Sequence, residues 1–438
     1  MSALALAARR RGIPVSGCDA DDSAFDDLRA AGATVHKGHD AAHVTGARAV
    51  VVTAAVKPDH PELLAARAAG IDVVPRKVAL AELVNAHTVV ALAGTHGKTT
   101  TTVMTTLALR AAGLSPSGLA GGRVASWGGN AWLDSNDLWV VEADEYDQAF
   151  LTLRPTIAVI NNVEADHLEC YGSLGAMEDA FVQFARDAQR VLIGNADQGS
   201  DRVAAKLGRN VLRFGVDGHA ALSVTLLGSG ESGSRAQLAW PDGHQLALQL
   251  AVPGVHNLRN ATAALGVVRE LGGDLESAAA ALSQFQGVGR RFERLGNAND
   301  IEFVDDYAHH PTELAATLEA ARQAFPGRRV VAVFQPHLYS RTKEHAVAMG
   351  KALTLADVAI VSDVYAAREQ PMPGVTGALV SSAAIAAGAR DVEYVAARDA
   401  LEAVVAARMC EGDLVITMGA GDVTMVGRHL HAQAAGAA

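Results

Sequence analysis

The sequence Gly94-Thr95-His96-Gly97-Lys98-Thr99-Thr100 lies between an apolar run at residues 88–93 and a helical pattern over residues 98–112. This order predicts a strand, a glycine-rich turn and a helix. Glycines let backbone N–H groups close around phosphate oxygens, and the helix start adds the positive end of its dipole. Lys98 can then reach the outer phosphates, and Thr99 can bind magnesium. The stretch predicts a site that uses a nucleoside triphosphate.

The match to the longer Walker A pattern is incomplete. That pattern has a further glycine five residues before Gly97, where this chain has Leu92. What remains is the shorter form Gly-x-x-Gly-Lys-Thr. The alternative is a strand-to-helix turn that contains lysine and threonine without holding phosphate, but the flanking strand and helix patterns favour the phosphate site.

Length and composition limit the class of protein. A chain of 438 residues is expected to form two or three domains. No apolar run reaches the roughly 20 residues that cross a bilayer, and the charges near Met1 follow the apolar stretch, which is the reverse of a secretory signal. We therefore expect a cytoplasmic protein without membrane insertion. The formal charge of −11 argues against an extended nucleic-acid surface.

The three cysteines predict neither a disulfide framework nor a structural zinc site. Cys18, Cys170 and Cys410 are scattered along the chain and show no C-x-x-C spacing. Their scarcity also agrees with a cytoplasmic location.

Alternating apolar runs and helical patterns divide the chain into three α/β domains, at residues 1–86, 87–288 and 289–438. In the first domain we expect strands at 49–53, which should be buried, and at 71–74. In the second we expect a parallel sheet with strands at 88–93, 138–141, 157–161 and 191–193. Its helix at 98–112 is closed by Gly113, and a β-rich insert follows around 222–252.

The third domain is expected to be doubly wound, with helices on both faces of a parallel sheet. Its predicted strands lie at 301–304, 330–334, 358–361, 392–395 and 414–417. Pro311 suits the first turn of a helix over 311–325, and Pro326-Gly327 should stop it. Polar clusters fall at the strand ends, where such sheets bind ligands.

Acidic residues follow two predicted strands of the second domain. Glu142 comes directly after the strand at 138–141, and His167 lies in the polar segment after the strand at 157–161. If these strands are adjacent, Glu142 and His167 lie beside the phosphate loop and can bind Mg²⁺, or Mn²⁺, which tolerates nitrogen better. The alternative is a solvated acidic loop. The metal site is favoured, because the charged residues come directly after apolar strands.

Asn257 and Asn260 are three residues apart at a predicted helix start and should share one face. Amides at such a place suit adenine or a carboxylate. The alternative is that both are plain helix caps.

Two polar clusters and an arginine pair mark the third domain. Arg290 and Arg291 lie at the domain junction, where an arginine can stabilise charge on a transferred phosphoryl group. The clusters at 305–311 and 334–342 each follow a strand. If those strands are neighbours, one cleft contains side chains able to hold a small zwitterion. These side chains are His309, His337 and Arg341. A lone histidine is more often structural, but three at strand ends favour function.

Taken together and in order, these motifs resemble the Mur ligase family. The segments that carry the resemblance are residues 94–100, 142–147, 164–167, 256–260, 305–313, 334–342 and 418–422. They cover nearly the whole chain, and the set is specific although each piece alone is weak. The resemblance implies an N-terminal Rossmann-like domain for a UDP-sugar, a central P-loop ATPase and a C-terminal Rossmann-like domain for ATP and an amino acid.

The resemblance also implies roles for the matching residues. Lys98 is expected to grip the ATP phosphates, with the magnesium sites served by Thr99, Glu142 and His167. Asn257 and Asn260 are expected to contact the nucleotide. The ATP site would be completed by Arg290 or Arg291 and by Asp305 or Asp306. The L-alanine pocket would be lined by Tyr307, His309, His337 and Arg341.

Three features depart from relatives. Members that use L-alanine usually begin with a strand and a Gly-x-Gly-Gly-Met-Ser type loop around the uridine diphosphate, whereas this sequence starts at Met1-Ser2-Ala3, inside that motif. We therefore expect the first domain to be N-terminally incomplete, which puts UDP binding in question. Leu338 stands where many relatives carry arginine, so carboxylate recognition should rest on Arg341. No carbamylated lysine is expected, because Glu142 and His167 stand in the metal motifs.

The implied activity is the ATP-dependent joining of L-alanine to the lactyl carboxylate of UDP-N-acetylmuramate, in peptidoglycan precursor synthesis. The carboxylate would attack the γ-phosphorus, and the amine of L-alanine would then attack the acyl phosphate, with His309 or Asp306 as candidate base. The domains should close around this intermediate, with hinges near Ala86 and residues 287–289. A monomer or homodimer is expected.

Three other functions remain open. A recycling ligase that attaches a murein peptide to the same UDP-sugar shares most of these motifs. A P-loop kinase or plain ATPase would release phosphate without an amino acid. A non-catalytic descendant would bind nucleotide or UDP-sugar without turnover.

Overall fold

The computed structural model describes residues 1–195, 197–208, 211–216, 220–231, 233–367 and 369–436. The chain forms two compact units. Unit 1 comprises Met1–Thr225, Ala236–Gln249 and Leu258–Gln284, and unit 2 comprises Leu226–Arg235, Leu250–Asn257 and Phe285–Ala438. Within the described ranges, no helix is both long enough and apolar enough to cross a membrane.

The first region of unit 1 contains two separate pairs of parallel strands. Its elements are α1 (Ser2–Arg10), β1 (Ser16–Asp19), α2 (Phe25–Ala30), β2 (Thr34–Lys37), η1 (Ala41–Val44), β3 (Ala49–Val52), α3 (Pro61–Ala68), β4 (Asp72–Pro75) and α4 (Arg76–Val84). Strand β1 pairs with β2, and β3 pairs with β4. The expectation that the strand at 49–53 is buried is wrong: β3 alternates exposed and half-buried residues. One face of β3 is exposed, whereas a buried strand is covered by packed elements on both faces.

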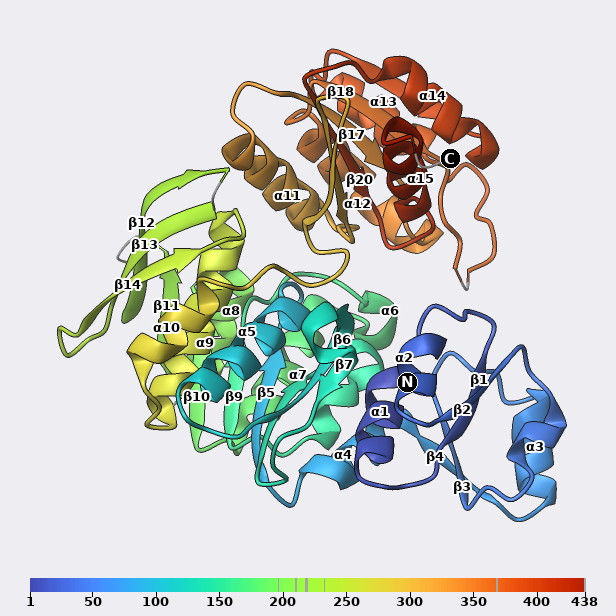
Figure 1. Cartoon of the computed structure of the whole chain (residues 1–438), viewed down its shortest axis with the longest axis vertical. Coiled ribbons are helices and arrows are strands. Elements are labelled where there is room, and N and C mark those ends of the chain that lie inside the picture. The colour runs from blue at the N-terminus through green and yellow to red at the C-terminus, as the bar shows by residue number, and fades with distance from the viewer. Residues whose placement is uncertain (196, 209–210, 217–219, 232, 368, 437–438) are drawn as a thin grey trace. The chain divides into compact units, whose positions relative to one another are not determined.

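The large sheet of unit 1 surrounds the strand before the phosphate loop. Its order is β14-β13-β12-β11-β10-β9-β5-β8-β6-β7 (Figure 1). The strands are β5 (Thr88–Ala93), β6 (Ser117–Val124), β7 (Gly129–Trp132), β8 (Leu138–Glu142), β9 (Ile157–Ile160), β10 (Arg190–Gly194), β11 (Leu212–Val216), β12 (Leu222–Gly230), β13 (Gly233–Ala239) and β14 (Gln245–Leu250). The predicted parallel sheet is confirmed, and β12 to β14 form the β-rich insert around 222–252, of which residue 232 lies outside the described ranges.

The helices of this part are α5 (Lys98–Ala111), α6 (Leu168–Tyr171), α7 (Leu174–Arg186), α8 (Gln198–Leu207), α9 (Val255–Glu270) and α10 (Leu275–Leu282), with short 3₁₀ turns η2 (Ala125–Trp127) and η3 (Tyr146–Thr152). Helix α5 contains buried threonines, and the hydroxyls of Thr101, Thr102 and Thr106 donate to carbonyl oxygens one turn earlier, at 2.8 to 2.9 Å. Helix α5 stops where predicted, because Gly113 has φ 84°.

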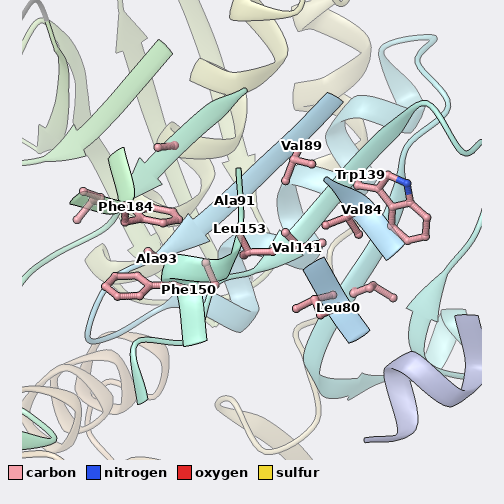
Figure 2. Packing of buried hydrophobic residues seen from close by; sticks show 14 of the residues in the cluster. Leu80, Val84, Val89, Ala91, Ala93, Trp139, Val141, Phe150, Leu153 and Phe184 are labelled. Atoms are coloured by element: carbon pink, nitrogen blue, oxygen red, sulfur yellow. The ribbon is translucent and has the colours of Figure 1, made fainter. Parts of the chain in front are cut away.

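The core beside β5 is built from every second residue of the strand. Val89, Ala91 and Ala93 belong to one cluster with Trp139 of β8 and with aromatic rings from η3 and α7 (Figure 2). Phe150 stacks on Phe184 with ring centroids 5.0 Å apart. This packing fixes β5, and with it the position of the phosphate loop.

Unit 2 has a six-stranded sheet in the order β15-β16-β20-β17-β18-β19, parallel except for the β15–β16 hairpin. The strands are β15 (Glu293–Ala298), β16 (Ile301–Asp306), β17 (Arg329–Phe334), β18 (Val358–Ser362), β19 (Val392–Val395) and β20 (Asp413–Met418). The helices are α11 (Pro311–Ala324), α12 (Tyr339–Leu353), α13 (Ala378–Ala386), α14 (Leu401–Arg408) and α15 (Thr424–Ala434), with η4 at Arg398–Ala400. One buried cluster joins the sheet to α11, α12 and α13, and a second joins it to α14 and α15. The doubly wound prediction is confirmed.

Candidate active site

The glycine loop after β5 has the backbone that the sequence predicts. Gly97 has φ 79° and Gly94 has φ 133°, both in the region that favours glycine. A Cβ on Gly97 would lie 2.7 Å from Oδ1 of Asn260. Asn260, predicted from its motif, is therefore next to the loop. Thr100 is buried in the first turn of α5.

Asn162 and Glu164, which follow β9, hold the loop from the side. The backbone N–H of His96 donates to Oδ1 of Asn162 at 2.7 Å. The Thr95 hydroxyl meets the backbone of Glu164, accepting from its N–H at 2.9 Å. Sequence reasoning did not assign Asn162 a role, although its position directly after a buried strand was the available signal.

Lys98 is held by the loop and by a buried carboxylate. Its Nζ donates to the carbonyl of Gly94 at 2.7 Å and pairs with Oε1 of Glu145 at 2.8 Å. Burial by itself lowers the pKa of Lys98, but the carboxylates of Glu145, Asp144 and Glu142 outweigh it, so the pKa is raised and the ammonium keeps its charge. Glu145 is a second residue that sequence reasoning left without a role, because the acidic run alone does not say which carboxylate points inward.

The side chains of Thr99 and Glu142 are in contact. The sequence predicts that they bind the same cation, and this role stays a prediction. The Thr99 hydroxyl donates to Oε1 of Glu142 at 3.0 Å, and the N–H of Gly121 donates to Oε2 at 2.5 Å. The predicted adjacency of the two acidic strands is wrong, because β5 lies between β8 and β9. The polar residues that follow β8 and β9 still lie beside the phosphate loop, because the loop follows β5 and the two strands lie on either side of β5.

His167 lies in the left-handed region, with φ 53°. Its Nε2 is 3.7 Å from Oδ2 of Asp166, and its ring meets Tyr146 with centroids 5.1 Å apart. Its Nδ1 is buried, makes no hydrogen bond among the described residues and lies 3.6 Å from Oε1 of Glu169. Its role as a magnesium ligand stays a prediction.

Asn257 does not act as a helix cap. Its Nδ2 donates to the carbonyl of Pro253 at 2.7 Å, whereas a cap accepts from a backbone N–H. The nucleotide role predicted for Asn257 and Asn260 stays a prediction, with the loop contact of Asn260 in its favour.

Arg290 and Asp305 are joined in unit 2. Nη2 of Arg290 donates to the carbonyls of Gly419 and Gly421 at 2.7 and 3.1 Å, and Nε lies 3.5 Å from Oδ2 of the fully buried Asp305. Asp305 also accepts from the hydroxyls of Thr417 and Thr424, at 2.6 and 2.8 Å. The structure thus brings the segment at residues 417–424 to Arg290 and Asp305, which lie more than 100 residues before it in the sequence.

The Tyr307 ring lies beside both arginines, with guanidinium carbons 4.8 Å (Arg290) and 4.9 Å (Arg291) from its centroid. Arg291 also faces Glu313 at 3.7 Å. Both oxygens of Asp306 are engaged by backbone N–H groups, from Phe292 and Ala308, each at 2.7 Å. Asp306 therefore fixes the turn that carries the arginines, a geometry that suits positioning better than proton transfer.

The buried Asp306 predicts a pH-dependent stability. Burial raises its pKa to about 6 from 3.8, with Arg291 opposing. Between these values the folded chain binds more protons than the unfolded chain, so stability falls as pH rises from about 4 to 6, by roughly 2 to 3 kcal/mol. Because other carboxyls titrate in the same range, the expected result is a difference: in urea unfolding, the stability of the wild type relative to Asp306→Asn should fall by this amount as pH rises. An equal slope in both would contradict the assignment.

His309 and His337 come together, with ring centroids 5.8 Å apart. Nδ1 of His309 lies 2.9 Å from the carbonyl of Tyr307, so that nitrogen carries a proton, and in the neutral ring Nε2 carries the lone pair. Nη1 of Arg341 lies 3.3 Å from Nδ1 of His337. The sequence argument assumed neighbouring strands, which is wrong because β20 separates β16 from β17. The rings of His309 and His337 nevertheless meet, although they follow strands that are not neighbours. Tyr365 is an unpredicted member of the cluster: its ring stacks on His337, with centroids 5.9 Å apart.

Leu338, between His337 and α12, has φ 67°, an unusual value for a non-glycine residue. Its N–H donates to the carbonyl of Tyr365 at 3.0 Å, and its side chain is buried. The apolar side chain at this position is therefore part of the packing and offers no charge to a substrate.

A phosphate loop with a charged lysine and paired oxygen ligands on one sheet, and an arginine–histidine cluster on another, define a modular α/β enzyme that uses a nucleoside triphosphate. Three family models match the chain: "Mur ligase family, catalytic domain" at residues 1–88, "Mur ligase middle domain" at 92–268 and "Mur ligase, glutamate ligase domain" at 290–421. The chain belongs to the Mur ligase family, and its fold comprises the three domains of that family.

Individual relatives agree with this membership. UDP-N-acetylmuramate–L-alanine ligase of Paenarthrobacter aurescens is 45% identical over 435 residues, covering 98% of this chain and 93% of that protein. The crystal structure of the UDP-N-acetylmuramate–alanine ligase MurC from Thermotoga maritima has a TM-score of 0.82 at 29% identity, covering 98% and 95%. A murein peptide ligase from Psychrobacter arcticus has a TM-score of 0.74 at 26% identity, covering 99% and 96%.

Proposed function

We infer that this chain is an ATP-dependent ligase that joins L-alanine to UDP-N-acetylmuramate in peptidoglycan synthesis. The observation that carries the inference is the 45% identity to UDP-N-acetylmuramate–L-alanine ligase over nearly the full length of both chains. The contacts of Lys98, Glu142, Arg290 and His309 supply the chemistry that such a reaction needs. Cell wall biogenesis in the cytoplasm is the proposed setting, and a monomer or homodimer the proposed state.

The residues around Thr99 fit a magnesium ion. A hydroxyl and a carboxylate 3.0 Å apart are hard oxygen donors beside a phosphate loop, which is the donor set that Mg²⁺ prefers. Thr99 and Glu142 would hold the ion, with His167 as a further candidate ligand. When bound, Mg²⁺ supplies positive charge that offsets the negative charge of the phosphates.

The proposed reaction has two steps. The lactyl carboxylate of the UDP-sugar attacks the γ-phosphorus of ATP, the bond from that phosphorus to the β-phosphate oxygen breaks, and an acyl phosphate and ADP form. Lys98, with Arg290 or Arg291, offsets the charge on the transferred group. The amine of L-alanine then attacks the acyl carbon, and inorganic phosphate leaves.

The amine must lose one proton as the amide forms. His309 is the better of the two candidate bases, because its Nδ1–H donates to Tyr307 and its Nε2 carries the lone pair. Asp306 has both oxygens occupied by backbone N–H groups. We propose that the L-alanine carboxylate is bound by Arg341 and that Tyr307 and His337 line the same pocket.

Product analysis tests the proposal directly. The chain is incubated with ATP, Mg²⁺, UDP-N-acetylmuramate and either L-alanine, glycine, L-serine or L-alanyl-γ-D-glutamyl-meso-diaminopimelate, and UDP-linked products are identified by mass spectrometry. UDP-N-acetylmuramoyl-L-alanine is the expected main product. Preferential coupling of the tripeptide would identify the recycling ligase instead, which the similarity to the murein peptide ligase keeps as the second candidate. ATP hydrolysis without any coupled product would contradict both.

Replacing Glu142 with glutamine tests the metal assignment. The amide keeps an oxygen for Thr99 but loses the charge, so we expect the Mg²⁺ concentration for half-maximal rate to rise about tenfold or more, equivalent to at least ~1.4 kcal/mol. Asp137→Asn is the matched control, since Asp137 is an exposed acid just before the opposite end of β8. Equal Mg²⁺ dependence in both variants would exclude Glu142 as a ligand.

We further propose domains at residues 1–86, 87–288 and 289–438; the ranges of the family models, 1–88, 92–268 and 290–421, support these boundaries.

A further inference from the structure

A group of side chains of types that can ligate a metal lies in the first region of unit 1, and the reaction described above assigns no role to any of them. Cys18 is near the end of β1, and His39 follows β2. His60 is the N-cap residue of α3, and Glu62 lies in its first turn. The carboxyl ends of two parallel strands and a helix start therefore deliver these side chains to one place.

Three donor atoms of different chemistry meet there. Sγ of Cys18 is 2.8 Å from Oε1 of Glu62 and 3.4 Å from Nδ1 of His39, and that nitrogen is 3.5 Å from Oε2 of Glu62. Glu62 is the centre of the group, with a side chain only 12% exposed. His39 is on the outer side, with 39% exposure, so the group is reachable from solvent.

These separations are close to those of ligands around a tetrahedral zinc ion. Bond lengths of about 2.0 to 2.3 Å place neighbouring ligand atoms roughly 3.3 to 3.6 Å apart. The two distances from His39, 3.4 and 3.5 Å, lie in that range. The shorter distance between Cys18 and Glu62 is that of a thiol donating to a carboxylate. A cation that replaced this proton would require the pair to separate by less than about 1 Å.

His60 is a further candidate donor, although in the described part of this region the donor atoms within 4.8 Å of one another are those of Cys18, His39 and Glu62 alone. Its Nδ1 is buried, has no hydrogen-bond partner among the described residues, and lies 3.8 Å from Oε2 of Glu62. A buried nitrogen without a partner is costly unless something else satisfies it. His43 is a weaker candidate, because its Nδ1 is already engaged, 3.0 Å from Oε1 of Glu62 and 3.3 Å from the backbone nitrogen of Asp40.

We propose that Cys18, His39 and Glu62 bind a zinc-class divalent cation, with His60 moving in as the fourth ligand. A thiolate ligand selects Zn²⁺ over Mg²⁺, which prefers oxygen. This site is therefore chemically distinct from the oxygen ligands at Thr99 and Glu142. The alternative is a hydrogen-bonded cluster that takes up no metal. Until a cation arrives the thiol is protonated, since burial and Glu62 raise the pKa of Cys18 to about 12.

Cobalt substitution tests the proposal without any activity assay. The metal-free full-length chain is titrated with Co²⁺, and absorption is recorded. We expect a thiolate-to-cobalt charge-transfer band, tetrahedral bands in the visible region, saturation at one thiolate-bound ion per chain, and displacement by Zn²⁺. Oxygen ligands at the phosphate loop produce no thiolate band. Its absence in the wild-type chain would overturn the proposal.

Two cysteine variants form the matched comparison. Cys18→Ser should lose the thiolate band, whereas Cys410→Ser, which removes an exposed cysteine of unit 2, should keep it. A band that survives in Cys18→Ser would overturn the proposal. Zn²⁺ should also raise the unfolding temperature of the wild type and of Cys410→Ser, but not of Cys18→Ser.

Glu62→Gln keeps Cys18 in place and guards against a folding defect in the serine variant. It should weaken Co²⁺ binding about tenfold or more, because it removes the only carboxylate of the four ligands. Unchanged affinity in this variant would overturn the assignment of Glu62. His60→Ala should also weaken binding, and unchanged affinity there would overturn only the fourth ligand.

Discussion

Replacing Lys98 with methionine is expected to lower kcat for ligation by about 10²- to 10³-fold, the usual effect of removing one preorganised electrostatic group. Lys98 is the charged group held within the loop, where its Nζ donates to two loop carbonyls at 2.7 and 3.2 Å, and we propose that it contacts the phosphates. Methionine has a similar length and no charge. Single-turnover formation of ADP, measured with saturating UDP-sugar, isolates this step from product release.

The same substitution should destabilise the chain, because the side chain of Glu145 is only 1% exposed and loses its partner. Breaking a buried ion pair costs about 3 to 5 kcal/mol when the remaining charge is kept, and less if the carboxyl takes up a proton. The double variant Lys98→Met with Glu145→Gln should recover stability in urea unfolding but not turnover. Recovery of turnover in the double variant would show that Lys98 acts only through structure.

Replacing Gly97 with alanine is expected to weaken ATP binding by about tenfold or more, equivalent to at least ~1.4 kcal/mol. The new Cβ would lie 2.7 Å from Oδ1 of Asn260 and 3.1 Å from Nδ2 of Asn161. Asn161 cannot yield easily, since it is buried and donates to the Thr101 hydroxyl at 2.9 Å. The loop backbone would therefore move away from the geometry that receives phosphate.

Gly113→Ala is the matched control for this variant. Gly113 has φ 84°, close to the 79° of Gly97, but a Cβ there meets nothing within 4 Å. Both variants should lose about 1 to 2 kcal/mol of stability from the left-handed backbone, and only Gly97→Ala should lose ATP affinity in isothermal titration. Equal ATP affinities in the two variants would contradict this prediction, because they would mean that the side chains around Gly97 move aside without changing the loop.

Much of the architecture could be predicted from periodicity. The strands before the polar motifs are continuous apolar runs, because a parallel strand covered on both faces must be apolar throughout. The helix after the glycine loop and the proline start of α11 follow from local rules that need no tertiary information. The prediction that the strand at 49–53 is buried is wrong for the same reason. Its apolar run resembles that of a strand covered on both faces, whereas β3 pairs with a single strand and has one exposed face.

Strand order could not be predicted, and both errors at the site arise from it. A strand pattern carries no record of which neighbour it will have, so β8 and β9 were placed together although β5 separates them. The contact of Glu145 with Lys98 and the contact of Tyr365 with His337 also depend on strand order, so the sequence could not predict them. The zinc-class cluster is a further example, since its ligands are spread over residues 18–62 without a recognisable spacing.

The sequence by itself determined the phosphate loop, the α/β class and the family, because these depend on residues that are neighbours along the chain or on motifs whose order is preserved. Only the tertiary structure decided which carboxylate neutralises Lys98, which oxygens Asp306 offers to the backbone, and that Cys18 meets His39 and Glu62. Such contacts join residues from different strands, and they are fixed by sheet order and side-chain packing rather than by local propensity.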